Sequence, residues 1–199
     1  MSNHQSQFST EFYQHPRWYA LSVKPQHEKR VATRLRYRGW EEFLPLHRSQ
    51  RFWSDRIKKL DLPLFPGYVF SRFSLENHRS VLEIPSVTSI IGFGNIPTPV
   101  SDKEIFDLKN LVASGFPLEP WPFLKVGQKI RIERGSLKGL EGILLQVRDS
   151  WRVVVSIFLL QRSIAVEIDA AFVSAIPNSG VPSETRYHRL QHSYGNVVS

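Results

Sequence analysis

Short apolar runs separated by glycine and proline dominate the first half of the chain. An apolar stretch broken by Pro45 leads into a polar, basic segment, a pattern that predicts a strand followed by a hairpin or loop. Three further runs predict strands, at residues 18–23, 67–70 and 87–93.

Helical patterns alternate with these strands. Residues 26–38 contain no glycine or proline, Val31 and Leu35 lie one turn apart, and Gly39 is a typical helix stop. Residues 75–82 predict a short helix. Residues 102–113 predict a longer one, capped by Ser101 or Asp102, because its apolar residues follow the 3.6-residue period. Alternating strands and helices of this kind predict a mixed α/β domain over 17–113.

The pattern changes after residue 113. Residues 114–123 hold three prolines and one glycine, a composition typical of a linker. Residues 124–177 then read as several short strands without a helix, which predicts a small β-barrel. The polar ends, 1–16 and 178–199, are expected to be disordered tails.

The positive charge is concentrated in one segment. The chain of 199 residues has a formal net charge of +8, and residues 24–59 hold eleven Lys and Arg against four acids. Within the helix at 26–38, Arg30, Arg34 and Arg38 recur every four residues and form one stripe, preceded by Lys24. Such a stripe suits phosphate contacts, which need charge and reach. An ordinary solvated helix face is the competing interpretation.

No catalytic constellation is found. The chain has no cysteine, which excludes disulfides and thiolate metal sites, and it lacks nucleotide-loop, nucleophile-elbow and zinc-protease motifs. His188 and His192 have the spacing of metal ligands on a helix but lie in a polar tail without nearby acids. We therefore expect no enzyme activity, no metal and no cofactor. No apolar run approaches the length of a membrane span or a signal peptide, so we expect a cytoplasmic protein without membrane contact.

The segment 64–70 (LFPGYVF) places aromatic residues at a turn and along the following strand. Core packing is the ordinary interpretation of such residues. Aromatic residues on both faces and at the turn do not all fit one core, however, which favours an exposed docking patch for some of them.

Together these motifs resemble a known family. Residues 18–21 (WYAL), the basic helix and 65–70 (FPGYVF) resemble the N-terminal (NGN) domain of the NusG transcription elongation factors. Residues 126–132 (VGQKIRI), followed by Gly135, Gly139 and Gly142, are similar to the KOW motif of that family's second domain. The resemblance implies an α+β fold, in which an NGN α/β sandwich of antiparallel sheet and helices precedes a small SH3-like KOW β-barrel.

The resemblance also implies a function and partners. A factor of this family bridges the cleft of RNA polymerase, suppresses pausing and modulates termination or antitermination. Its apolar patch binds the β′ clamp helices, which implies this role for Phe65, Tyr68, Phe70 and Phe93. A polar turn contacts the β gate loop, which implies Asn77, His78 and Arg79. Non-template DNA is the implied partner of Lys24, Arg30, Arg34 and Arg38.

The barrel is implied to recruit a second partner around Phe158 and Arg162, which in the family is ribosomal protein S10 or the termination factor Rho. Residues 159–161 depart from the general factor and look more like UpxY-like or RfaH-like antiterminators. β-Branched and aromatic residues at 153–166 favour strands, so we expect a permanently β barrel, an unmasked polymerase patch and a monomer. A ribosome-associated, RNA-binding KOW protein is the alternative function.

Overall fold

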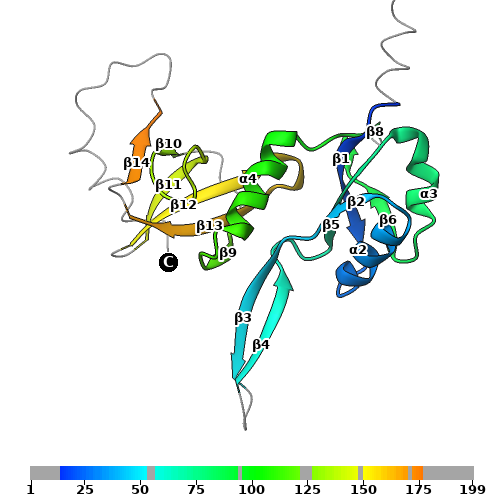
Figure 1. The fold of residues 1–199 in the computed structure, drawn as a ribbon, viewed down its shortest axis with the longest axis horizontal. Helices are drawn as coiled ribbons and strands as arrows, with labels where there is room; N and C mark the ends of the chain where they lie inside the picture. Colours follow the sequence, from blue (N-terminus) through cyan, green and yellow to red (C-terminus); the bar gives the residue numbers. More distant parts are fainter. Residues whose placement is uncertain are drawn as a thin grey trace, which may run out of the picture.

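The computed structural model describes residues 14–52, 57–93, 96–121, 127–147, 150–169 and 172–176. Figure 1 shows two bodies side by side with one helix between them, and a two-stranded ribbon that projects away from both. We call the body built around residues 17–113 the α/β domain and the strands of residues 118–176 the β domain.

A four-stranded antiparallel sheet organises the α/β domain. Its strand order is β2 (Glu41–Phe43), β5 (Tyr68–Phe73), β1 (Arg17–Val23) and β6 (Val87–Ile90). The central strands β1 and β5 are in register with Ala20 opposite Phe70 and Leu21 opposite Val69. The strands predicted at 18–23 and 67–70 are confirmed as β1 and β5. The strand predicted at 87–93 ends at Ile90, and Gly92–Phe93 form a separate short strand outside this sheet.

One face of this sheet is covered by α2 (Glu28–Tyr37) together with the 3-10 helix η1 (Leu75–Asn77) and α3 (His78–Leu82). The alternation of β1 sends Tyr19 and Leu21 to this face, where they share a buried cluster with Val31 and Leu35 of α2. The helical period predicted from Val31 and Leu35 therefore places both residues in the core.

The opposite face carries Trp18, Ala20 and Phe70, and they belong to a second buried cluster. Helix α4 (Asp102–Ala113) contributes Ile105, Leu108 and Leu111 to it. The helix begins as predicted: Ser101 accepts from the Glu104 N–H at 3.1 Å, and Glu104 accepts in return from the Ser101 N–H at 3.2 Å. This cluster continues into the β domain through Leu118, Ile130 and Ile164 among others.

The β domain is a six-stranded antiparallel sheet. Its order is β14 (Val173–Ala175), β10 (Gln128–Ile132), β11 (Glu141–Val147), β12 (Ser150–Ile157), β13 (Arg162–Ile168) and β9 (Leu118–Trp121). A Cβ at Gly142 would lie 2.8 Å from the Val154 carbonyl oxygen, so glycine is needed where β11 and β12 approach. The predicted fold class, a mixed α+β chain with antiparallel sheets, is confirmed.

Part of the predicted linker at 114–123 is a strand. Residues 118–121 form β9, which pairs with β13 from Leu118 opposite Val166 to Trp121 opposite Ser163. Pro120 is compatible with this strand because β9 is an edge and one side of its backbone has no partner strand. Only Ser114 to Pro117 separate α4 from the β domain.

Two hairpins stand outside the two large sheets. Strands β3 (Leu46–Phe52) and β4 (Ile57–Pro63) pair with each other over seven residues, and β7 (Gly92–Phe93) pairs with β8 (Ile96–Pro97). The basic segment, predicted to be a hairpin or a loop, is a hairpin. The predicted tail at 178–199 and most of the one at 1–16 lie outside the described residues.

Candidate protein and nucleic-acid interfaces

The turn before β5 is held by a buried carboxylate. Glu28, only 4% exposed, accepts from the Gly67 N–H at 2.8 Å, and the Gly67 carbonyl accepts from the Val23 N–H at 2.8 Å. Gly67 has φ +83°, a conformation that favours glycine. Glu28 therefore fixes the path of the chain between Phe65 and Tyr68. No local pattern indicates this role, because in the sequence Glu28 is one acid among basic residues.

The four residues predicted to bind the clamp helices have different environments. Phe65 is 2% exposed and Phe70 is fully buried, and their rings meet edge to face with centroids 5.8 Å apart. Tyr68 is half-buried, whereas Phe93 is 61% exposed. The expectation of an unmasked patch is therefore wrong for Phe65 and Phe70.

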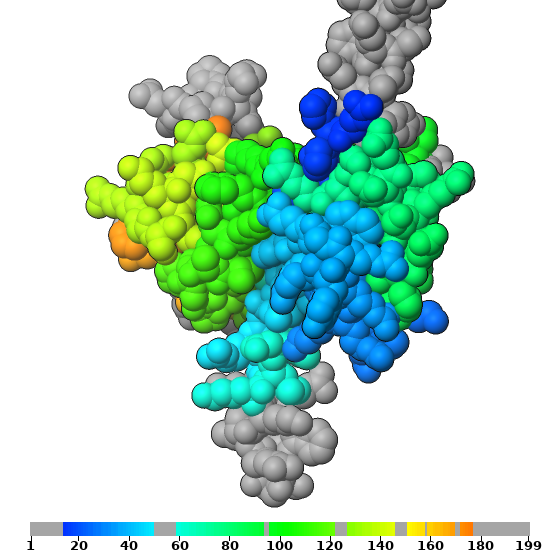
Figure 2. Space-filling view, turned by 45° about the vertical axis from the view of Figure 1, so that its right-hand side comes forward, coloured from blue at the N-terminus to red at the C-terminus, as the bar shows by residue number. Residues whose placement is uncertain are grey.

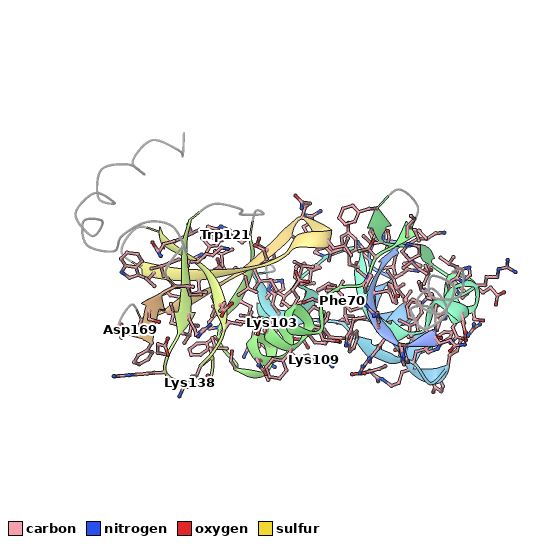
Figure 3. All side chains as sticks on the ribbon, turned by 90° about the horizontal axis from the view of Figure 1, so that it is seen from above. Phe70, Lys103, Lys109, Trp121, Lys138 and Asp169 are labelled. Atoms are coloured by element: carbon pink, nitrogen blue, oxygen red, sulfur yellow. The ribbon has the colours of Figure 1, made fainter. Side chains whose placement is uncertain are left out.

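Helix α4 and the β domain explain this burial. Lys109 of α4 donates to Glu41 at 2.9 Å and lies 4.5 Å from the centre of the Trp18 ring, which ties the helix to the sheet. Lys103, on the same helix, lies 4.0 Å from Glu141 of β11. Figure 3 shows Lys103 and Lys109 between the two domains, with Phe70 on the side of the sheet that faces them. The aromatic face is thus closed by elements that follow it in the sequence.

Phe93 belongs to a small exposed apolar hairpin. Its cross-strand partner on β8 is Ile96, which is 69% exposed. Sequence reasoning missed Ile96, although the Gly-Asn dipeptide between the two residues is a known hairpin signal. Gly92 permits the close approach of the strands, because a Cβ there would overlap the Ile96 carbonyl.

The residues predicted for the gate-loop contact lie at the start of α3 rather than in a loop. Asn77 donates to the Ser74 hydroxyl at 3.0 Å, and the His78 ring lies 2.7 Å from the Leu75 carbonyl oxygen. Asn77 and Arg79 are exposed, and His78 is half-buried. Hydrogen-bond partners at the start of η1 therefore orient the side chains of Asn77 and His78.

The arginine stripe is partly docked on the α/β domain itself. Arg34 donates to the Pro85 carbonyl at 3.1 Å and Arg38 to the Ser80 carbonyl at 2.9 Å. Lys24 and Arg30 are exposed. Because each bound guanidinium uses one nitrogen on a carbonyl, its remaining N–H groups are still available to an anion.

In the β domain, η2 (Phe158–Leu160) forms the turn between β12 and β13. Figures 1 and 3 both show this turn on the side nearest the α/β domain, and Leu159 and Leu160 join the shared apolar cluster. Arg162 is exposed, while the Phe158 side chain lies outside the description. The predicted partner surface therefore lies close to the contact between the domains.

A broad hollow of about 870 Å³ lies on the β domain between the exposed rings of Phe116 and Phe172. Within it, Arg152 pairs with Glu119 at 2.6 Å and lies 5.3 Å from the centre of the Trp121 ring. Burial lowers the pKa of His47, at the base of the β3–β4 hairpin, and the Glu119 carboxylate partly opposes that shift. The hairpin base and the edge strand β9 are thus electrostatic neighbours.

The described part of the chain holds neither a metal-ligand cluster nor a candidate membrane-spanning helix. No group of three His, Asp or Glu side chains there is placed to hold a metal ion, and His188 and His192 lie outside it. No helix among the described residues is long and apolar enough to cross a membrane.

The geometry defines a class: an α+β chain with an exposed apolar hairpin and exposed basic side chains, both of which suit contacts with macromolecules. Residues 16–109 match the family model described as transcription termination factor NusG. The chain is 26% identical over 180 residues to the transcription termination/antitermination protein NusG of Pasteurella multocida, covering 80% of this chain and 95% of the relative. It is 28% identical over 167 residues to the protein of the same name from Campylobacter jejuni, covering 76% and 93%.

A solved structure described as domain interaction in Thermotoga maritima NusG has the same fold. Its TM-score is 0.52 at 22% identity, and the match covers 81% of this chain and 98% of that one. Together, the family-model match and the curated relatives support a NusG-family factor, and the structural neighbour supports its fold.

Proposed function

We propose that this chain binds RNA polymerase across its cleft, suppresses pausing and modulates termination or antitermination. The observation that carries the proposal is the exposed Phe93–Ile96 pair on a hairpin held by the α/β domain. An exposed aromatic residue is a typical anchor of a protein interface. The names of the two curated relatives support the transcriptional role.

The clamp-binding surface is proposed to exist in two parts. Phe93 and the half-buried Tyr68 are accessible in the closed arrangement, while Phe65 and Phe70 become accessible only if α4 and the β domain move away from the sheet. Lys103–Glu141 and the shared apolar cluster support the closed arrangement. Polymerase would select the open form by binding it more tightly.

Two further contacts of the α/β domain belong to the proposal. Asn77, His78 and Arg79 would meet the β gate loop, and their replacement by alanine should lengthen pauses while clamp binding is kept. Lys24, Arg30, Arg34 and Arg38 would follow the non-template strand. Removing two of these arginines should flatten the salt dependence of single-stranded DNA binding by about 1.4 on a log–log scale.

The β domain is proposed to recruit ribosomal protein S10 or Rho through Phe158 and Arg162. Because their turn lies beside the α/β domain, partner binding there and domain closure would compete. Chemical-shift changes in the β12–β13 turn on adding S10 or Rho would support this assignment. Shifts confined to other strands would contradict it.

The alternative is a ribosome-associated RNA-binding protein. The basic segment lies in the α/β domain, not in the β domain, which speaks against a β domain built mainly for RNA. Copurification with the tagged full chain separates the two functions. We expect polymerase subunits, and ribosomal RNA without polymerase would support the alternative.

A further inference from the structure

Strand β9 sets how far the β domain can lie from the α/β domain. Its residues pair with β13, so they belong to the β-domain sheet, and Ser114–Pro117 join them to α4. Figure 2 shows this part of the chain, in green, between the yellow-green β domain and the blue first half of the α/β domain. Four extended residues cover at most about 14 Å. If β9 left the sheet, the connection would comprise residues 114–127, and its extended length would rise to about 50 Å.

Arg152 of β12 reaches across β13 to hold two of the four residues of β9. Its Nη1 donates to Oε2 of Glu119 at 2.6 Å, and its guanidinium carbon lies 5.3 Å from the centre of the Trp121 ring. Glu119 and Trp121 lie on the same face of β9, because side chains alternate along a strand. Ala165 lies opposite Glu119 in the ladder, and its small side chain leaves room for this reach. The Arg152 side chain is only 20% exposed, so solvent screens its contacts incompletely.

The rest of β9 is held weakly. It is a four-residue strand at the edge of the sheet, and Pro120 has no N–H to donate to a neighbouring strand. Leu118 is buried in the apolar cluster that the two domains share. Segments with few stabilising contacts open locally while the rest of a domain stays folded. We therefore expect β9 to leave the sheet before β12 and β13 separate.

We propose that β9 is a releasable clasp between the two domains, and that Arg152 keeps this clasp closed. In the closed state, the short connection and the shared apolar cluster hold the β domain against α4. In the released state, the longer connection lets the β domain move away while both domains stay folded. This inference rests on the proposed function only for the use of the movement, which would uncover Phe65 and Phe70.

The test follows the domain contact through the reactivity of a single thiol. The natural chain has no cysteine, so Leu160→Cys places the sole thiol at a buried position of the turn nearest the α/β domain. Val154→Cys is the matched reporter, because Val154 is buried in the β domain but lies outside the shared cluster. A neutral maleimide reacts with a buried thiol only in molecules that have opened, so the reaction rate reports even rare opening.

Arg152→Met keeps the length of the side chain and removes the guanidinium. Loss of one ion pair and one cation–π contact should speed the reaction of the Leu160→Cys thiol about tenfold. The reaction of the Val154→Cys thiol should keep its rate, because the β domain stays folded when the clasp is released. The matched control, Arg36→Met, removes an arginine–glutamate pair within the α/β domain and should change neither rate.

A double-mutant cycle shows whether Arg152 acts through β9. Glu119→Gln should also speed the reaction of the Leu160→Cys thiol. Adding it to Arg152→Met should have no further effect, because both changes remove the same ion pair. Independent, multiplying effects of the two changes would overturn the assignment of Arg152 to the clasp.

Three other results would overturn the clasp: an unchanged rate at the Leu160→Cys thiol in Arg152→Met, an equal increase in Arg36→Met, or an equal increase at the Val154→Cys thiol. The last result would show that Arg152 stabilises the β domain as a whole. No polymerase enters these measurements. Failure of the natural chain to bind polymerase would therefore reject the proposed function and leave the result for the clasp unchanged.

Discussion

Replacing Glu28 with alanine should destabilise the α/β domain through the turn that it holds. The carboxylate is 4% exposed and accepts from the Gly67 N–H at 2.8 Å. A hydrogen bond to a charged group contributes about 1.5–3 kcal/mol, and its loss leaves a backbone donor without its partner. Glu28 is also the first residue of α2, where a negative charge adds about 0.3–1 kcal/mol. We expect Glu28→Ala to lower the free energy of unfolding by about 2–4 kcal/mol.

Urea denaturation followed by tryptophan fluorescence measures this loss. Glu28→Gln is the matched variant, because its side-chain carbonyl keeps an acceptor for Gly67 while the charge is removed. It should lose about half as much stability as Glu28→Ala. A loss below about 0.5 kcal/mol in Glu28→Ala, with native circular dichroism, would refute the role of Glu28 in holding the turn.

Three other changes test the fold. Ser101→Ala removes one half of the capping box of α4 and should cost about 1 kcal/mol in thermal unfolding; a neutral effect would mean that the cap does not stabilise the helix. Gly142→Ala should destabilise the β domain by about 1–3 kcal/mol, because its Cβ would lie 2.8 Å from the Val154 carbonyl oxygen; native stability would show that β11 and β12 separate easily. Burial lowers the pKa of His47 in the folded chain, so the unfolded chain binds a proton at a higher pH. The free energy of unfolding should therefore fall as pH drops below about 6.5. His47→Gln should flatten this pH dependence, and an unchanged pH profile in that variant would contradict the role of His47.

Local pattern was sufficient to predict most of the elements. The helical period of Val31 and Leu35 and the capping residue Ser101 identify α2 and α4, because both depend on neighbours within one turn. The strand β9 was missed because Pro120, with Pro117 and Pro122 on either side of the strand, gives the segment the composition of a linker. Whether a proline-containing segment becomes an edge strand depends on β13, which follows more than 40 residues later.

The aromatic segment shows a different limit. The sequence indicates that its residues occupy both faces of a strand. A single core would cover only one of those faces, which predicts an exposed patch on the other. The structure has a buried cluster on each face instead, with Phe73 in one and Phe70 in the other. The second cluster depends on α4 and the β domain, and no local pattern reports which face a later element will cover.

The central claim is that this chain binds RNA polymerase through its exposed apolar hairpin. The most direct test is the dissociation constant of the full chain for purified polymerase, compared with those of Phe93→Ala and of Phe172→Ala, an exposed control in the β domain. Loss of an aromatic anchor worth about 2 kcal/mol should raise the constant about 30-fold for Phe93→Ala. Phe172→Ala should bind like the natural chain. Equal affinities in all three proteins, or no binding by the natural chain, would contradict the claim.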